Sequence, residues 1–274
     1  METKYKLAVS VDFTETSRHS FSESLYLAKR ANLEVVIVHI NCDPTKTEAD
    51  FDKLITEMIE DNGDAAKEVD ISYRIIPGEK GEIVERLART IDQIDPLYVV
   101  VGYEIKRGMD RFVGPNIKKI IYETKYPVIA LKNMETVKEL TTLFFPLTLE
   151  QFSRQKTNIS IKFVKDMNLK FQLLPLRISN TKKDDVHQEI ITNNMIKKLD
   201  DHNVDYDVEW EEGNDEVKIL LEKTAEDNTG IVSVVFESSP DFLDNFRTTR
   251  EEKLLQMTQD PLLIVKSHHS PFLY

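Results

Sequence analysis

The sequence predicts an α/β protein made of two similar tandem domains, each with a five-stranded, mainly parallel sheet flanked by helices. Three observations lead to this prediction. Short apolar runs that are typical of buried strands alternate with stretches of helical periodicity through the first half of the chain. The same order returns in the second half at a constant spacing. The composition is that of a globular protein, with 41% hydrophobic and 31% charged residues in a chain of 274.

The expected elements of the first half alternate between strand and helix. The continuous apolar run LYVVVG is typical of a strand that is buried on both faces. In the helices, apolar side chains recur at intervals of about one turn, as Ile83, Leu87 and Ile91 do. The segment FTETSRHS offers hydroxyls that can cap the first helix. Strands are expected at residues 6–12, 33–40, 70–77, 97–102 and 126–132, and helices at 20–32, 50–66, 81–94 and 116–125.

Three pairs of segments indicate an internal duplication. YPVIALK returns as DPLLIVK, GEIVERLART returns as DEVKILLEKT, and LYVVVG returns within GIVSVVF. Each pair has the same spacing of 134 residues, as between Tyr126 and Asp260. We therefore predict two domains, residues 1–135 and 136–274, with their boundary in the polar segment NMETVKEL.

Charge and composition narrow the function classes. The net charge is −12 and the isoelectric point is about 5.1, which disfavours nucleic acid and anionic membrane surfaces as partners. The single cysteine, Cys42, excludes an intrachain disulfide and a cysteine-based zinc site, and we predict no metal site. No apolar run approaches the roughly 20 residues of a membrane span, and METKYKLAVSVDF lacks the apolar region of a signal peptide. We therefore expect a cytoplasmic protein.

No catalytic residues are predicted. The nucleophile elbow G-x-S-x-G, the zinc motif H-E-x-x-H and the P-loop pattern are all absent from the sequence. An enzyme is therefore the least favoured class of protein. A slow nucleotide hydrolase or a transferase is the enzymatic alternative.

Several motifs together resemble the universal stress protein family. They are a strand that ends in VDFTETS, a second strand that ends in VHI, a glycine-containing loop after VVVG, and the strand PVIAL. The tandem two-domain form of the family is the most similar, over residues 1–135 and more weakly over 136–267. The resemblance implies a Rossmann-like fold related to the adenine nucleotide alpha hydrolases. In this family, some members bind ATP through a glycine pattern, whereas others lack the pattern and are not known to bind ATP.

Carried over residue by residue, the resemblance implies a site for ATP or another adenine nucleotide in the first domain only. Asp12 would contact the nucleoside, and Ile40 would pack against adenine. The loop would supply further contacts. The complete set of candidate residues is Asp12, Ile40, Gly102, Gly108, Gly114 and Asn116.

The loop departs from the family pattern in two places. Ile105 replaces the second glycine, and a side chain there restricts the approach of an anion to the backbone. Pro115 replaces the hydroxyl residue that should follow Gly114, and proline has no N–H to donate. Pro115 is also a favourable first residue for a helix, so the segment GPN can serve only to begin the helix, without any ligand. Against this, the basic side chains of Lys106, Arg107 and Arg111 favour phosphate.

Two further alternatives stay open at the level of sequence. Asp12 can contact a ligand, or it can cap the following helix together with Thr14 or Thr16. In the second domain Thr148 takes the place of Asp12, and the segment after Phe236 has no glycine. Phosphate binding in that domain is therefore not expected, and its role is architectural.

The resemblance implies a regulatory stress-response protein that binds adenine nucleotide weakly in its first domain. The alternative is a protein-interaction module in which both sites are vestigial, with protein partners that the sequence does not identify. The family commonly pairs through its last strand. We therefore predict an intramolecular pseudo-dimer through the strands from Pro127 to Lys132 and from Pro261 to Lys266, with a further homodimer as an option.

Overall fold

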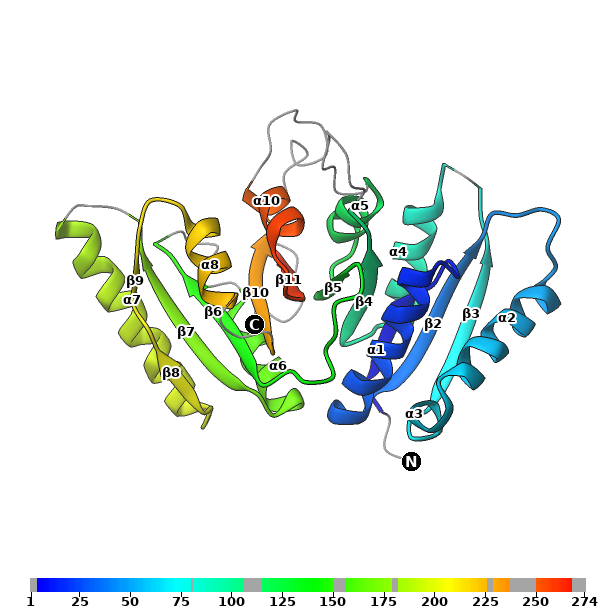
Figure 1. Cartoon of the computed structure of the whole chain (residues 1–274), viewed down its shortest axis with the longest axis horizontal. Coiled ribbons are helices and arrows are strands. Elements are labelled where there is room, and N and C mark those ends of the chain that lie inside the picture. Colours follow the sequence, from blue (N-terminus) through cyan, green and yellow to red (C-terminus); the bar gives the residue numbers. More distant parts are fainter. Residues whose placement is uncertain are drawn as a thin grey trace. The chain divides into compact units, whose positions relative to one another are not determined.

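The computed structural model describes residues 4–79, 81–105, 115–149, 156–178, 182–225, 229–236 and 250–267. The chain divides into two compact units, Met1–Lys138 and Glu139–Tyr274. Each unit contains a parallel sheet with helices on both faces (Figure 1). The α/β class and the five-stranded parallel sheets predicted from the sequence are confirmed.

In the first unit the strand order is β3-β2-β1-β4-β5, and every neighbouring pair is parallel. The chain thus runs outward from β1 to β3 and then returns to the other side of β1. The elements are β1 Lys6–Ser10, α1 Glu15–Ala31, β2 Glu34–Asn41, α2 Glu48–Asp61, α3 Gly63–Lys67, β3 Ile71–Pro77, α4 Ile83–Ile94, β4 Tyr98–Tyr103, α5 Pro115–Glu123 and β5 Val128–Lys132.

In the second unit the order is β11-β10-β6-β7-β8, again parallel throughout, and the short strand β9 also pairs with β7. The sheet order of the first unit is therefore repeated. The elements are β6 Thr142–Leu147, α6 Thr157–Met167, β7 Lys170–Arg177, α7 Lys182–Asp201, β8 Tyr206–Val208, β9 Glu211–Glu212, α8 Glu216–Thr224, β10 Gly230–Phe236, α10 Arg250–Met257 and β11 Leu262–Lys266.

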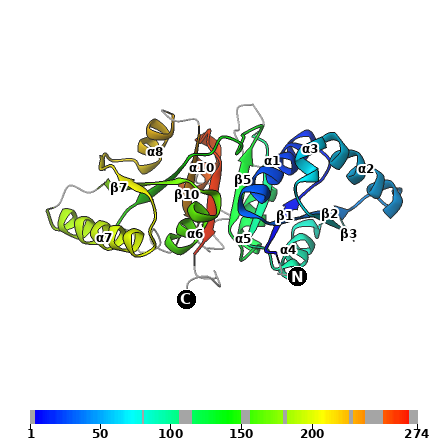
Figure 2. The same cartoon turned by 90° about the horizontal axis from the view of Figure 1, so that it is seen from below.

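Helices cover both faces of each sheet (Figure 2). In the first unit α1, α2 and α3 lie on one face, and α4 and α5 lie on the other, where they contact each other. In the second unit α6 and α7 share one face, and α8 and α10 share the other. The strand predicted to be buried on both faces is β4, with five of its six residues buried, and all seven residues of β10 are buried.

Local chemistry explains where the helices begin and end. Thr14 caps α1, because its side chain accepts a hydrogen bond from the Ser17 amide. Asn32 and Asn168 end α1 and α6 in the left-handed conformation, at φ of 52° and 48°, which asparagine adopts more readily than most residues. The helix predicted at 50–66 is broken into α2 and α3 at Gly63, where φ is 49°.

The boundary between the two units lies at 138/139, within the polar segment NMETVKEL. Thr136 and Val137 both donate hydrogen bonds to the Glu23 carboxylate of α1. These bonds tie the segment after β5 to the first unit. Among the described residues, none of the helices is both long and apolar enough for a membrane span.

Candidate functional site

The first unit has a crevice at the point where its strand order reverses. Because the chain leaves β1 in one direction and returns at β4 on its other side, the loops after these two strands diverge. A cavity of about 230 Å³ lies there. Its polar lining comes from the ends of β1 and β4 and from the start of α1, namely Ser10, Asp12, Thr14, Ser17 and Glu104. Ile83 and Leu87 of α4 and Ile117 of α5 form part of its apolar wall.

Asp12 lies at the exposed mouth of this cavity, two residues after β1. Its Oδ1 accepts hydrogen bonds from the Thr14 amide at 3.1 Å and from the Thr14 hydroxyl at 2.6 Å. Burial on its own would raise the pKa of Asp12, but the hydrogen bonds from Thr14 and Ser17 outweigh it and hold the pKa below its ordinary value. The carboxylate is therefore ionised at neutral pH. Thr14 serves as the helix cap, and Asp12 orients Thr14.

Gly102 has a packing role. A Cβ atom at this position would lie 2.2 Å from the Ser20 hydroxyl and 2.9 Å from the Thr16 carbonyl oxygen, both on α1. Helix α1 therefore approaches β4 so closely that only glycine fits without a shift. Close approach to α1 is enough to explain this glycine, whatever the loop after it binds.

Glu104 anchors the first residues of the loop after β4. Its Oε1 accepts a hydrogen bond from the Thr16 hydroxyl of α1. With Asp12, it gives the described lining of the cavity two carboxylates and no cation. The described walls thus suit a ligand that donates hydrogen bonds better than they suit phosphate.

The remaining candidate residues are placed as follows. Within the described part of the chain, Ile40 does not line the cavity. It packs against Gly78 instead, where an added Cβ atom would lie 2.4 Å from the Cγ2 of Ile40. Asn116 is the second residue of α5, which begins at Pro115 as the helix-start interpretation expects. Gly108 and Gly114, with the three basic residues between Ile105 and Gly114, lie outside the described residues. Asp12 and Gly102 are therefore brought together, and Ile40 is not.

An aromatic cluster lies beside the crevice. The ring of His39, the third residue from the end of β2, contacts those of Phe13 and Phe51, with centroid distances of 4.8 and 4.4 Å, and the two phenylalanine rings stack at 6.0 Å. Its Nδ1 lies 2.8 Å from the Val11 carbonyl oxygen, and burial lowers the pKa of His39. The imidazole is thus neutral at pH 7 and donates to Val11. Phe13 has a φ of 65°, a left-handed backbone that the sequence does not signal.

In the second unit a buried lysine crosses the equivalent reversal point. Lys156, which is 1% exposed, donates from Nζ to the carbonyl oxygens of Pro146 in β6 at 2.9 Å and of Ser233 in β10 at 2.7 Å. Its Nζ also lies 4.4 Å from the centre of the Phe145 ring. Thr148 directly follows β6 and carries no carboxylate. The two units therefore differ where their sheets are most alike.

We expect Lys156→Met to change how stability depends on pH. Burial lowers the pKa of Lys156 well below its ordinary value, so the unfolded chain binds a proton at a pH where the folded chain resists it. The wild-type free energy of unfolding should therefore rise, relative to the variant, as pH increases from 7 toward the ordinary lysine pKa of about 10.4. Urea denaturation at several pH values checks this. Lys218→Met, at an exposed position on α8, should parallel the wild type, and parallel curves for Lys156→Met would contradict the expectation.

No family model and no curated protein matches the chain. The crystal structure of a universal stress protein from Archaeoglobus fulgidus DSM 4304 aligns with a TM-score of 0.70 at 15% identity, over 95% of this chain and 98% of that one. A functionally unknown protein from Pseudomonas aeruginosa PAO1 aligns with a TM-score of 0.64 at 10% identity, over 99% and 95%.

A third structure, of a universal stress protein family protein from Arabidopsis thaliana with AMP bound, covers 47% of this chain and 92% of that one, at 17% identity and a TM-score of 0.34. The doubly wound sheets and the two full-length alignments define the class as an open α/β fold. More particularly, the chain has the fold of universal stress proteins along its whole length, in a two-unit form. The fold that the sequence motifs implied is thus confirmed.

Proposed function

We propose that the chain is a regulatory protein of the universal stress type whose first unit binds an adenine nucleotide weakly. The observation that carries this proposal is the ionised Asp12 carboxylate at the mouth of the cavity between β1 and β4. In open α/β sheets, ligands bind in the crevice where the strand order reverses.

Asp12 supports a nucleoside because its geometry is set before any ligand arrives. Thr14 donates to one carboxylate oxygen from both its amide and its hydroxyl, which fixes the position of that oxygen. An ionised carboxylate has about four lone-pair positions, so it can also accept hydrogen bonds from ribose hydroxyls. Bonds to a charged acceptor are stronger than neutral ones, at about 1.5–3 kcal/mol each.

The cavity's charge favours a ligand with few phosphates. Asp12 and Glu104 repel a polyphosphate, and the described lining offers no cation to offset them. Binding of ATP would depend on Lys106, Arg107 and Arg111, which lie outside the described residues. We therefore expect the affinity for AMP to equal or exceed the affinity for ATP.

Titration calorimetry of the full chain with AMP, ADP and ATP tests the proposal. We expect Asp12→Asn to weaken AMP binding about tenfold, because the variant keeps an acceptor oxygen but loses the charge. Asp43→Asn is the matched control. Asp43 accepts hydrogen bonds from the Thr45 amide at 3.0 Å and from the Thr45 hydroxyl at 2.6 Å, in a separate turn that has the same pattern of bonds as the turn at Asp12. No heat with any of the three nucleotides at millimolar concentration would end the proposal.

A second candidate is a protein-interaction module without a nucleotide. The acidic lining of the cavity and the packing role of Gly102 favour it. It differs from the first candidate in one result: a stably folded Asp12→Asn protein would keep its full cellular function. Loss of that function in Asp12→Asn, but not in Asp43→Asn, would count against it.

A further inference from the structure

The second unit has a cavity of its own, of about 180 Å³, at the carboxyl ends of β6 and β7. The strand order β11-β10-β6-β7-β8 places the reversal point between β6 and β10, where Lys156 lies. The cavity is on the other side of β6, and it is lined by Thr148 and Leu149 after β6 and by Leu176 at the end of β7. Thr148 holds the position that Asp12 has in the first unit, but the cavity lies on the other side of β6 from the reversal point.

A buried amide of α7 lines this cavity with unused hydrogen-bonding capacity. Gln188 is 1% exposed, and its Nε2 donates to the Leu147 carbonyl oxygen at the end of β6 at 2.7 Å. Its Oε1 is buried and accepts no hydrogen bond from the described residues. An unsatisfied buried acceptor costs about 1–3 kcal/mol, so the position favours a ligand that donates a hydrogen bond.

The charged lining favours a cation. It consists of three carboxylates, from Asp184, Asp185 and Glu216, and one guanidinium, from Arg177. The Nε of Arg177 lies 4.0 Å from Asp185 of this lining, its Nη1 lies 2.9 Å from Glu212, and its guanidinium lies 4.4 Å from the Trp210 ring centre. Glu216 pairs with Arg250. Each carboxylate can accept several hydrogen bonds, so existing partners do not exhaust it. The lining thus carries more negative than positive charge.

Size and apolar walls limit the ligand further. Leu149, Leu176 and Ile178 add apolar side chains to the lining of the cavity. An engineered apolar cavity of about 150 Å³ in another protein holds benzene, so a space of about 180 Å³ suits a small organic molecule and not a nucleotide.

We propose that this cavity binds a primary ammonium ion with a short apolar chain. The ammonium donates to the Gln188 Oε1 and to the carboxylates of Asp184 and Asp185, while the chain packs against Leu176 and Ile178. The donors, the charge and the volume all match the lining described above. The site is separate from the nucleotide site of the first unit and does not depend on it.

Three ligands of equal size and different charge test the proposal on the full chain. Titration followed by NMR uses n-butylamine, n-butanol and butyrate at pH 7, where the amine is a cation. We expect saturable binding of n-butylamine only. The double variant Asp184→Asn, Asp185→Asn should raise its dissociation constant about tenfold or more, and Gln188→Leu should raise it severalfold. Asp207→Asn removes a carboxylate of β8 that pairs with Lys170 outside the cavity, and it should leave binding unchanged.

Three outcomes would overturn the proposal. The first is the absence of saturable n-butylamine binding. The second is equal binding of n-butanol, which would show that charge plays no part. The third is unchanged affinity in the aspartate variant, which changes partly exposed positions and so decides the matter even where Gln188→Leu does not fold. AMP binding should persist in every one of these variants, which keeps this result distinct from the fate of the first unit's site.

Discussion

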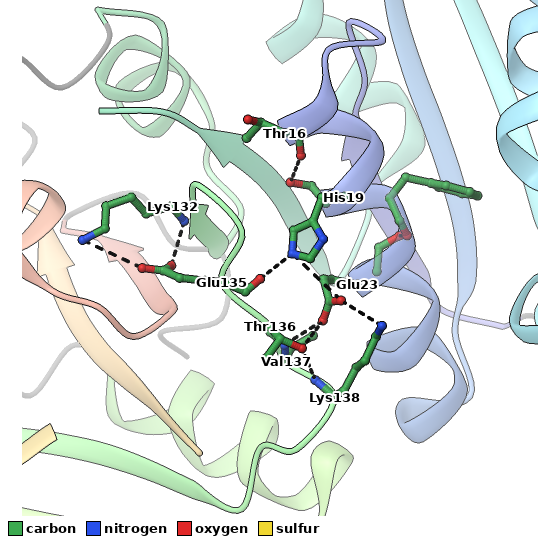
Figure 3. Close-up of polar contacts among 11 residues, drawn as sticks. Thr16, His19, Glu23, Lys132, Glu135, Thr136, Val137 and Lys138 are labelled. Carbon is green, nitrogen blue, oxygen red and sulfur yellow. Dashed lines mark hydrogen bonds and ion pairs between the residues drawn. The ribbon is translucent and has the colours of Figure 1, made fainter. Parts of the chain in front are cut away.

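Replacing Glu23 with alanine is expected to lower the free energy of unfolding by about 2–4 kcal/mol. Glu23 lies on α1 and is fully buried. Its Oε2 accepts hydrogen bonds from the Thr136 hydroxyl at 2.9 Å and from the Val137 amide at 2.8 Å (Figure 3). Its Oε1 lies 3.5 Å from Nζ of Lys138. This carboxylate therefore holds Thr136, Val137 and Lys138 of the segment that follows β5.

The size of this effect comes from the groups that the alanine leaves behind. The Val137 amide is buried, and without Glu23 it has lost its acceptor inside the protein. His19 bonds the same segment through the Glu135 carbonyl oxygen at 2.7 Å, so the contact weakens without disappearing. Glu23→Gln keeps an acceptor oxygen but loses the charge, and it should cost less than alanine does.

Urea denaturation measures the difference for Glu23. Glu57→Ala is the control, because Glu57 is a half-exposed residue of α2 whose distance to Lys53 is 3.8 Å, and such pairs contribute less than about 1 kcal/mol. A Glu23→Ala protein as stable as Glu57→Ala would show that the segment after β5 is not held by this carboxylate.

The second large effect is expected at Gly102. Gly102→Ala should destabilise the protein by about 1–3 kcal/mol, because the added methyl group overlaps the Ser20 hydroxyl and presses on the Thr16 carbonyl. The backbone carbonyl cannot move without displacing α1. Ser20→Ala in the same chain removes the nearer of the two contacts, at 2.2 Å, and should restore part of the loss.

A double-mutant cycle on Gly102 and Ser20, measured by denaturation, separates packing from ligand binding. Coupling between the two substitutions is expected to be favourable, since they share one contact. If Gly102→Ala left stability unchanged and only weakened AMP binding, the packing explanation would be wrong, and the glycine would serve the ligand alone.

Much of the fold can be predicted from the sequence, because apolar residues dominate the strands. The strand expected at 97–102 is β4, Tyr98–Tyr103, and the helix expected at 81–94 is α4, Ile83–Ile94. The first helix begins at Glu15, five residues before the expected position, because its buried face is polar. That face includes Thr16, Ser20 and Glu23, which hydrophobic periodicity does not detect.

Less of the candidate site can be predicted from the sequence. Asp12 reaches the crevice because a residue just after β1 must lie at the carboxyl edge of the sheet. Lys156, Gln188 and Glu23 could not be singled out, since nothing in the sequence distinguishes a buried polar side chain from an exposed one. The pairing of the two repeats through their last strands stays a prediction, as do the roles of Gly108 and Gly114.

The central claim is that the first unit alone keeps a nucleoside crevice, while Lys156 crosses the matching position of the second. Photolabelling of the full chain with 8-azido-AMP, followed by mass mapping of the labelled peptides, tests it most directly. We expect the label within residues 4–138, displaced by excess AMP and strongly reduced in Asp12→Asn. Label within residues 139–267 that AMP displaces, or label in the first unit that persists in Asp12→Asn, would contradict the account.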